Sequence, residues 1–110
     1  EPLVRRSIAL LLDEHEVVEV GDVASAIELC GRSPPDLVLC DLMLPGLPGS
    51  ALHEALMRTN PALAARIVYV TGGAFTQAAQ DFLARIGNVI LLKPFSLGEM
   101  HAAIAEARER

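Results

Sequence analysis

Three polar side chains, Asp41, Thr71 and Lys93, each follow directly after a short run of apolar residues. The runs before them have the sequences Leu-Val-Leu-Cys, Ile-Val-Tyr-Val and Val-Ile-Leu-Leu. A carboxylate, a hydroxyl and an ammonium group, brought together, suit an oxyanion that is held on or beside the carboxylate. Asp41 is therefore the candidate reactive group, and Thr71 and Lys93 are the candidate groups that bind the oxyanion.

The apolar runs predict the elements that position these side chains. Runs this short, rich in branched residues and bounded by Pro and Gly, are typical of buried parallel strands. In an open parallel sheet, ligands and chemistry gather at the carboxyl ends of the strands. Asp41 is 30 residues before Thr71 and 52 residues before Lys93, which leaves room for one strand–helix unit in each interval. We therefore expect the three side chains at one edge of one sheet.

The other segments complete an alternating pattern. Apolar spacing predicts a first helix over residues 1–12, with Leu3, Val4 and Ile8 inward and Arg5 and Arg6 on the opposite face. Residues 16–20 alternate and predict a strand at the edge of the sheet. Further helices are expected over residues 23–30, 49–59, 76–86 and 96–110, with a short turn at 61–65. The predicted fold is a doubly wound α/β domain with a parallel sheet.

Composition limits the classes of protein that the chain can belong to. Its 110 residues, 52% of them hydrophobic, predict one folded domain over residues 1–110. The formal charge of −5, with no basic cluster larger than Arg5-Arg6, argues against nucleic acid binding by this domain. No apolar run approaches the length of a membrane span, so we expect no membrane contact. Cys30 and Cys40 are expected to be reduced, buried side chains in a cytoplasmic protein.

The three motifs together resemble the receiver domain of two-component response regulators and hybrid sensor kinases. Asp41 with its following Leu-x-x-Pro-Gly turn, Thr71 before Gly72, and Lys93 before Pro94-Phe95 lie at the family's spacing. The stretch from Val70 to Thr76 and the Lys-Pro-Phe motif are most similar to receivers at the end of hybrid histidine kinases. The resemblance implies a flavodoxin-like fold in which Asp41 is phosphorylated.

The resemblance also implies roles for the other site residues. Lys93 pairs with Asp41 or with a phosphoryl oxygen, and Thr71 with the N–H of Gly72 binds another oxygen. It implies a cis peptide at Lys93-Pro94. Mg²⁺ is the implied cofactor, held by Asp41 and the backbone carbonyl of Met43, and it needs several hard oxygen ligands. The implied partner is a histidine kinase or a histidine phosphotransfer domain.

One strand of the family pattern is missing from these residues. Receivers begin with a buried strand that ends in an acidic pair, commonly followed by Glu-Pro, and this chain begins at Glu1-Pro2. We therefore expect a receiver truncated at its N-terminus, without the first strand and the acidic pair. That strand is central in the family, so its removal is expected to leave a gap in the sheet, or a vacancy filled by another copy or segment.

Two alternative functions remain open at this point. Many receivers carry an aromatic residue three positions before the lysine, where this chain has Ile90. Together with the missing acidic pair, Ile90 favours a pseudo-receiver that binds a partner without phosphorylation. A phosphatase with Asp41 as nucleophile would need a second acid two residues later, and Met43 occupies that position. The expected protein is thus a self-phosphorylating acceptor rather than a conventional enzyme.

Overall fold

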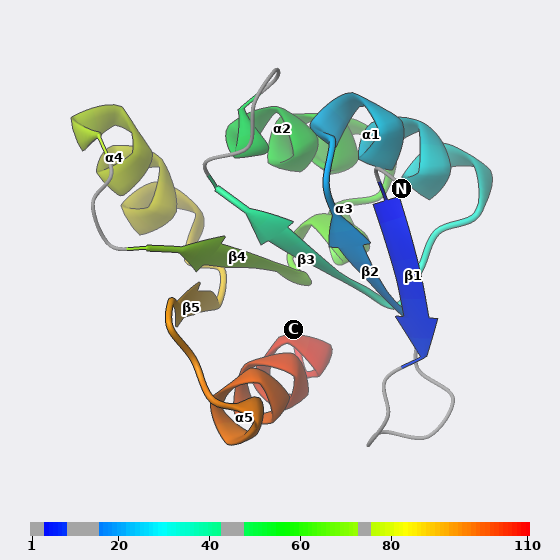
Figure 1. The fold of residues 1–110 in the computed structure, drawn as a ribbon. Helices are drawn as coiled ribbons and strands as arrows, with labels where there is room; N and C mark the ends of the chain where they lie inside the picture. The colour runs from blue at the N-terminus through cyan, green and yellow to red at the C-terminus, as the bar shows by residue number, and fades with distance from the viewer. Residues whose placement is uncertain (1–3, 9–15, 43–47, 73–75) are drawn as a thin grey trace.

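The computed structural model describes residues 4–8, 16–42, 48–72 and 76–110, with the side chains of 4–8 left out of the description. Ten elements follow one another along the chain (Figure 1). They are β1 (Val4–Ile8), β2 (Glu16–Val20), α1 (Val23–Arg32), β3 (Leu37–Asp41), α2 (Gly49–Thr59), α3 (Pro61–Ala64), β4 (Ile67–Thr71), α4 (Gln77–Ile86), β5 (Ile90–Leu92) and α5 (Leu97–Arg108). The alternation of strands and helices confirms the predicted α/β class.

The strands form one five-stranded sheet in the order β1-β2-β3-β4-β5. Strands β2 to β5 are parallel, and β1 pairs antiparallel with the outer edge of β2. The register places Val38 beside Ile67 and Asp41 beside Val70, while Thr71 pairs with Leu92. The carboxyl ends of β3, β4 and β5 therefore lie side by side, as the sequence predicted.

The prediction of a helix over residues 1–12 is wrong for residues 4–8, the part of this range that the structure describes. Val4–Ile8 is a strand, with Val4 opposite Val20 and Ile8 opposite Glu16. The backbone N–H and C=O groups along the outer edge of β2 need partners, and an antiparallel neighbour supplies them. Strand 16–20 is consequently an inner strand rather than the predicted edge. The remaining residues of the predicted helix lie outside the described residues.

We expected a gap in the sheet between β2 and β3, where the family's first strand lies. The described sheet has no such gap. β2 pairs directly with β3, with Val17 beside Leu37 and Val20 beside Cys40. Direct pairing satisfies the backbone polar groups of both strands, which a gap would leave without partners. No segment from another molecule is needed between the two described strands.

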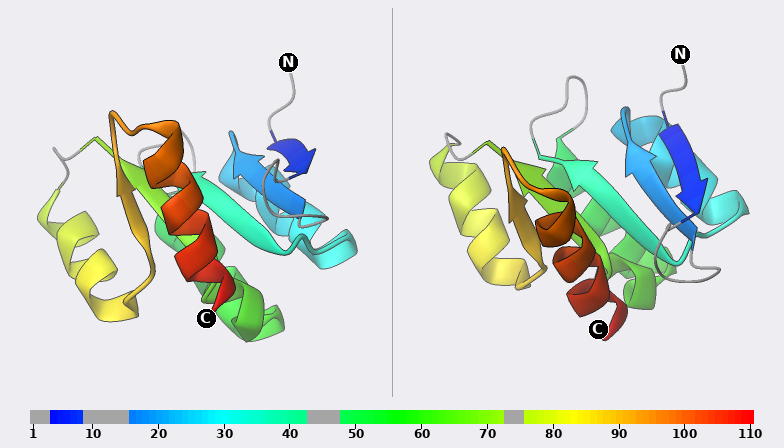
Figure 2. Two further views of the ribbon diagram at one scale, coloured as in Figure 1. Left: turned by 90° about the horizontal axis from the view of Figure 1, so that it is seen from below. Right: turned by 60° about the horizontal axis from the view of Figure 1, so that its bottom comes forward.

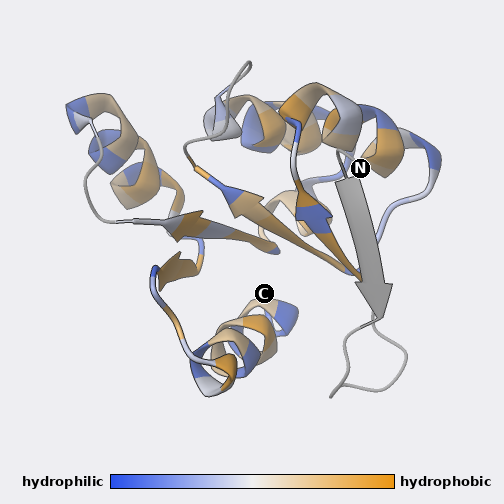
Figure 3. Cartoon of the chain, viewed as in Figure 1, coloured by the Kyte–Doolittle hydropathy of each residue, from blue (hydrophilic) through white to orange (hydrophobic). Residues whose placement is uncertain are grey.

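Two apolar cores lie on the two faces of the sheet. One core joins α1, α2, α3 and α4 to the face that carries Val18, Cys40 and Tyr69. The other joins α5 to the face that carries Leu39 and Val70. Figure 2 shows α5 alone on its side, and Figure 3 shows hydrophobic residues along β3 and β4 between the layers. No helix among the described residues is long and apolar enough to cross a membrane.

Local sequence signals set the ends of the later helices. Thr76 caps α4 through the N–H of Ala79, and Gly87 ends that helix at φ 70°, where a side chain would be strained. Ser96 and Glu99 form a capping box at the start of α5. α1 continues through Gly31 to Arg32, two residues beyond the predicted range 23–30, and Leu97 in the first turn of α5 is 63% exposed.

A buried asparagine was not singled out by the sequence analysis. Asn88 is only 8% exposed, and its side-chain amide donates hydrogen bonds of 2.8 Å to the carbonyl oxygens of Ala64 and Ile67. It therefore joins the turn before β5 to the segment between α3 and β4. This contact keeps the start of β4 in place beside β5.

We expect Asn88→Ala to lower the free energy of unfolding by about 2 kcal/mol. Two buried hydrogen bonds are lost, and the carbonyl groups that accepted them gain no other donor. Urea denaturation followed by circular dichroism measures the change. Glu28→Gln, an exposed substitution on α1, is the control and is expected to change stability by less than about 0.5 kcal/mol. Equal effects of the two substitutions would contradict the proposed role of Asn88.

Candidate active site at the carboxyl ends of the strands

Backbone hydrogen bonds bring the three predicted side chains to one edge of the sheet. The N–H of Leu42, just after β3, donates to the Val70 carbonyl at 2.9 Å. The N–H of Lys93, just after β5, donates to the Thr71 carbonyl at 2.8 Å. β4 is thus held between β3 and β5 up to its last residue. The positions of Asp41, Thr71 and Lys93 follow from the strand register.

The structure brings Asp41 and Lys93 into direct contact. The Lys93 Nζ atom donates to the Asp41 Oδ2 atom at 2.5 Å. The side chains are 26% exposed for Asp41 and 48% exposed for Lys93, so the pair faces solvent and can meet another molecule. A carboxylate that stays accessible while an ammonium group neutralises its charge is suited to attack an electrophile that is itself an anion.

Thr71 and Gly72 lie next to this pair but differ from it in exposure. Thr71 is 1% exposed, whereas Gly72 is exposed and has no heavy atom within 4 Å of an added Cβ. Gly72 directly follows β4, the strand between those that lead to Asp41 and Lys93, and among the described residues nothing would contact a side chain there. The Lys93-Pro94 peptide is cis, as the resemblance implied.

The described residues alone do not make a magnesium site. Met43, whose carbonyl was an expected ligand, lies outside them. Among the described residues no group of three or more His, Cys, Asp and Glu side chains is placed to hold a metal ion. Asp41 provides one hard oxygen donor, and Mg²⁺ requires an octahedral set of about six ligands. A complete site would need oxygen donors from beyond the described residues or from solvent.

The chain is similar in sequence to known signalling proteins. The sequence profile of the response regulator receiver domain matches residues 1–105. The chain is a member of the response regulator receiver domain family. The transcriptional activator protein PfeR of Pseudomonas aeruginosa is 41% identical over 104 residues, which cover 83% of this chain and 31% of PfeR. The sensor histidine kinase TmoS of Ectopseudomonas mendocina is 30% identical over 95 residues, covering 86% of this chain and 10% of TmoS.

Solved structures of receiver domains share the fold. The signal receiver domain of a Luxo repressor protein from Vibrio parahaemolyticus superposes with a TM-score of 0.68 at 22% identity, over 83% of this chain and 68% of that one. The receiver domain of the response regulator NarL from Mycobacterium tuberculosis gives 0.66 at 25% identity, over 80% and 69%. The chain spans about a third or less of the length of the curated relatives named above.

A buried tyrosine connects the receiver site to the first turn of α2. Tyr69 lies two residues before Thr71 and is fully buried, and its hydroxyl donates a 2.6 Å hydrogen bond to the Gly49 carbonyl. Gly49 allows this approach, because a Cβ there would lie 3.1 Å from the Tyr69 ring. Burial raises the pKa of Tyr69, so the hydroxyl stays a donor. Strand alternation predicts that Tyr69 shares a face with Thr71, whereas its hydrogen-bond partner is apparent only from the structure.

An aromatic cluster continues from Tyr69 to α4. The rings of Tyr69 and Phe82 meet edge to face at 5.5 Å, and Phe82 meets His53 of α2 in the same way at 5.8 Å. The Arg85 guanidinium lies 5.7 Å from the Phe82 ring. Burial lowers the pKa of His53, and the nearby Arg85 charge lowers it further. Residues of β4, α2 and α4 therefore pack against one another in one aromatic cluster, and its member Tyr69 lies two residues before Thr71.

The residue before the reactive aspartate is also buried. Cys40 is 0% exposed, and burial together with the neighbouring Asp41 charge raises the pKa of its thiol to about 12, from an ordinary value of 9.0. It is a free thiol, as the sequence predicted. Its side chain packs in the core between the sheet and the helices α1 to α4.

We expect the free energy of unfolding to fall as pH rises from about 9 toward about 12. In this window the unfolded chain releases the Cys40 proton while the folded chain retains it, so unfolding releases a proton. The contribution approaches about 1.4 kcal/mol per pH unit. Urea denaturation at a series of pH values tests this, with Cys40→Ala as the comparison. If the free energy of unfolding had the same pH dependence between pH 9 and 10 in the wild type and in Cys40→Ala, the raised pKa of Cys40 would be contradicted.

Proposed function

We propose that this receiver domain accepts a phosphoryl group on Asp41 from the phosphohistidine of a histidine kinase or a histidine phosphotransfer domain. The observation that carries the proposal is the solvent-accessible Asp41–Lys93 pair at the carboxyl ends of β3 and β5. Family membership supports it, because receiver domains receive phosphoryl groups from histidine kinases. The similarity to the sensor histidine kinase TmoS supports a place in a phosphorelay, and we propose that the domain acts in the cytoplasm.

The proposed transfer is a displacement at phosphorus. An oxygen of the Asp41 carboxylate attacks the phosphorus atom, the P–N bond to the donor imidazole breaks, and its electron pair stays on the imidazole nitrogen. The product on this chain is an acyl phosphate. The Lys93 ammonium group is placed to neutralise charge on a phosphoryl oxygen. In this proposal Thr71 and the N–H of Gly72, an exposed residue, bind a second oxygen.

Magnesium remains part of the proposal through the family resemblance, with the Asp41 carboxylate and the Met43 carbonyl as donors. Bound Mg²⁺ would neutralise phosphoryl charge. The described residues do not complete its ligand set. Positioning and charge neutralisation by Lys93 are the contributions that the geometry supports.

The signal would leave the site through Tyr69. Drawing Thr71 toward a phosphoryl group moves the end of β4, and Tyr69 is two residues away on the same strand. Its hydrogen bond to Gly49 and its ring contact with Phe82 carry that movement to α2 and α4. A cavity of about 180 Å³ between the first turns of these helices, lined in part by Leu42 and Thr76, gives them room to shift. The contacts of Tyr69 thus offer a route for the signal, even though Ile90 stands where many receivers carry an aromatic residue.

We expect incubation with acetyl phosphate and Mg²⁺ to add one phosphoryl group to the chain, measured by intact mass. Asp41→Asn is expected to abolish the gain, because it removes the nucleophile. Lys93→Gln is expected to slow it by at least about tenfold, through loss of the group that neutralises charge in the transition state. Lys93 is the only lysine, so Arg58→Gln, an exposed cation of α2, is the matched control and is expected to react like the wild type.

A folded wild-type chain that gains no phosphoryl group would contradict the phosphoacceptor function. That result would favour the alternative, a phosphorylation-independent pseudo-receiver that acts as a protein-interaction module. The lack of a metal-binding group of three or more His, Cys, Asp and Glu side chains among the described residues is the observation that keeps this alternative in view. A gain retained by Asp41→Asn would instead show that another residue is the acceptor.

For the signalling route, we expect Tyr69→Phe to leave the amount of acyl phosphate unchanged but to reduce the response of α2 and α4. The ring packing is kept, while the hydrogen bond to Gly49 is lost at a cost of about 1 kcal/mol. Amide chemical shifts before and after phosphorylation measure the response. Thr59→Val, which removes the hydrogen bond to Ala55 at the other end of α2, is the control. If the chemical shifts of α2 and α4 responded equally to phosphorylation in Tyr69→Phe and Thr59→Val, the proposed route through Tyr69 would be contradicted.

A further inference from the structure

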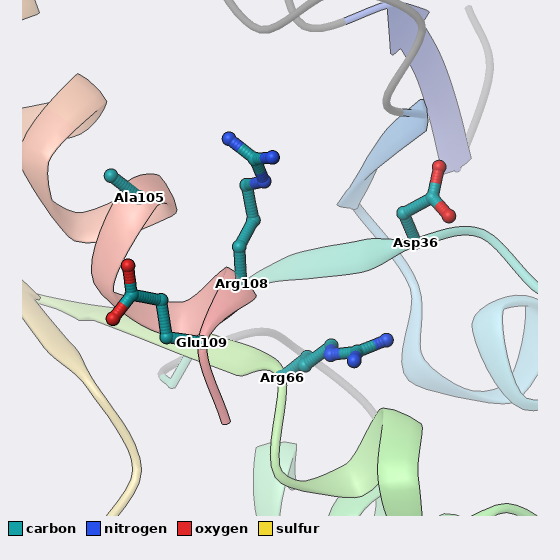
Figure 4. Close-up of a pocket in the computed structure, with 5 residues that line it drawn as sticks. All are labelled: Asp36, Arg66, Ala105, Arg108 and Glu109. Carbon is teal, nitrogen blue, oxygen red and sulfur yellow. The ribbon is translucent and has the colours of Figure 1, made fainter.

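Cavities at the two edges of the sheet differ in the side chains that line them. At the amino ends of β3 and β4, a cavity of about 260 Å³ is lined mainly by charged residues (Figure 4). Figure 4 shows the Arg66 and Arg108 guanidinium groups of this cavity pointing apart, so they form no common binding site. The cavity of about 180 Å³ between the first turns of α2 and α4 lies at the other edge and has mostly apolar walls.

The α2–α4 pocket, as we call this second cavity, is open to solvent on one side. Leu42 and Phe82 form its buried part, with 7% and 5% of their surfaces exposed. The other apolar lining residues are Pro48, Gly49, Ala78 and Ala79. Pro48, Ala78 and Thr76 are exposed, so the pocket opens at the surface. α2 and α4 lie on the same side of the sheet, which makes the pocket a gap between neighbouring helices (Figure 1).

The size and chemistry of the α2–α4 pocket fit one apolar side chain. Among its described lining residues only Ser50 and Thr76 carry a hydroxyl group, and the Thr76 Oγ1 atom already accepts from the N–H of Ala79 at 3.1 Å. Water therefore finds few hydrogen-bond partners in it. An apolar cavity of about 150 Å³ can hold a benzene molecule, so a leucine or phenylalanine side chain would fit into this one. Its transfer from water into the pocket would be favourable.

The position of the α2–α4 pocket indicates which molecule would fill it. Leu42 directly follows Asp41, so their Cα atoms are about 3.8 Å apart. A histidine kinase that phosphorylates Asp41 has to cover the edge of the sheet at which this carboxylate is exposed. A specific protein–protein contact covers about 800 Å² on each partner, which is far wider than the spacing of about 4.8 Å between neighbouring strands. A kinase domain over Asp41 would therefore also cover the opening of the pocket.

The charge at this edge suits the same partner. α2 begins at Gly49 and α4 at Gln77, so the N-terminal ends of both helices lie at the pocket. Each such end carries a positive partial charge of about half an elementary charge. The Lys93 ammonium group adds a full positive charge beside Asp41. A phosphohistidine is an anion, so these charges favour its approach to the edge that also holds the pocket.

We propose that the α2–α4 pocket receives one apolar side chain of the histidine kinase that donates the phosphoryl group to Asp41. The inference rests on the proposed function, because phosphoryl transfer is what brings the kinase to this edge. The inserted side chain packs against Leu42 and Phe82 and holds the kinase over Asp41. The pocket thereby contributes to the choice of partner without contacting the phosphoryl group.

Binding of an apolar side chain is tested with N-acetyl-leucine amide, titrated into the ¹⁵N-labelled chain and followed by NMR. We expect saturable shifts of the Gly49, Ala78 and Ala79 amides, and none with N-acetylglycine amide, which lacks the side chain. Ala78→Leu fills the pocket from an exposed helical position and is expected to abolish the saturable shifts. Ala84→Leu, at an exposed position of α4 that does not line the pocket, is the matched control and is expected to bind like the wild type. The absence of saturation with N-acetyl-leucine amide in the wild type would overturn the proposal.

The kinase as the occupant is tested by comparing two phosphoryl donors. Acetyl phosphate has no side chain to insert, so the wild type, Ala78→Leu and Ala84→Leu are expected to react with it at the same rate. With the autophosphorylated sensor histidine kinase TmoS as donor, Ala78→Leu is expected to accept the phosphoryl group about tenfold more slowly than the wild type, the effect of losing one buried apolar contact. Ala84→Leu is expected to accept it at the wild-type rate.

The outcomes separate the docking inference from the function on which it rests. A wild type that gains no phosphoryl group from acetyl phosphate would contradict the proposed function itself. If acetyl phosphate reacts and TmoS phosphorylates the wild type and Ala78→Leu at equal rates, the docking inference alone is overturned. A wild type that reacts with acetyl phosphate but not with TmoS would overturn the choice of a sensor kinase as the occupant, even if N-acetyl-leucine amide binds.

Discussion

The parallel register of β3, β4 and β5 is the constraint on which both ends of this domain depend. The register fixes Asp41 beside Val70 and Thr71 beside Leu92, so one set of backbone hydrogen bonds places the candidate reactive groups. It simultaneously places residue 66, just before β4, beside the start of β3. Because a shift of one residue would turn every side chain to the opposite face, the two cores hold this register firmly.

Much of this arrangement could be predicted from the sequence, because the signals for it are local. A buried parallel strand needs an apolar run with turn residues after it, and three such runs identified the edge that carries Asp41 and Lys93. Helix caps are similarly local, and Ser96 with Glu99 was recognisable from four consecutive residues. The first residues of the chain were mispredicted because their partner is nonlocal. Apolar spacing at Val4 and Ile8 suits a helix, yet the unpaired edge of β2 selects a strand.

The contacts of Tyr69 show where prediction from sequence stops. Strand alternation predicts only that Tyr69 shares a face with Thr71, and its hydrogen bond to Gly49 joins residues 20 positions apart. Nothing in the local sequence at either residue specifies this contact. A glycine just after Pro48 indicates a turn, whereas in the structure it also allows a close approach of the tyrosine ring. Contacts of this kind depend on how α2 packs across β4, which is a property of the assembled layers.

The charges at the two ends of the sheet have different physical consequences. At the carboxyl ends, Lys93 compensates Asp41 in the absence of any ligand, so a phosphoryl group must compete for or share that ammonium group. At the amino ends, the Arg66 Nε atom is buried without a hydrogen-bond partner among the described residues, which costs stability. The same five-stranded sheet thus carries an accessible, compensated charge pair at the edge proposed for chemistry and a buried, uncompensated donor at the opposite edge.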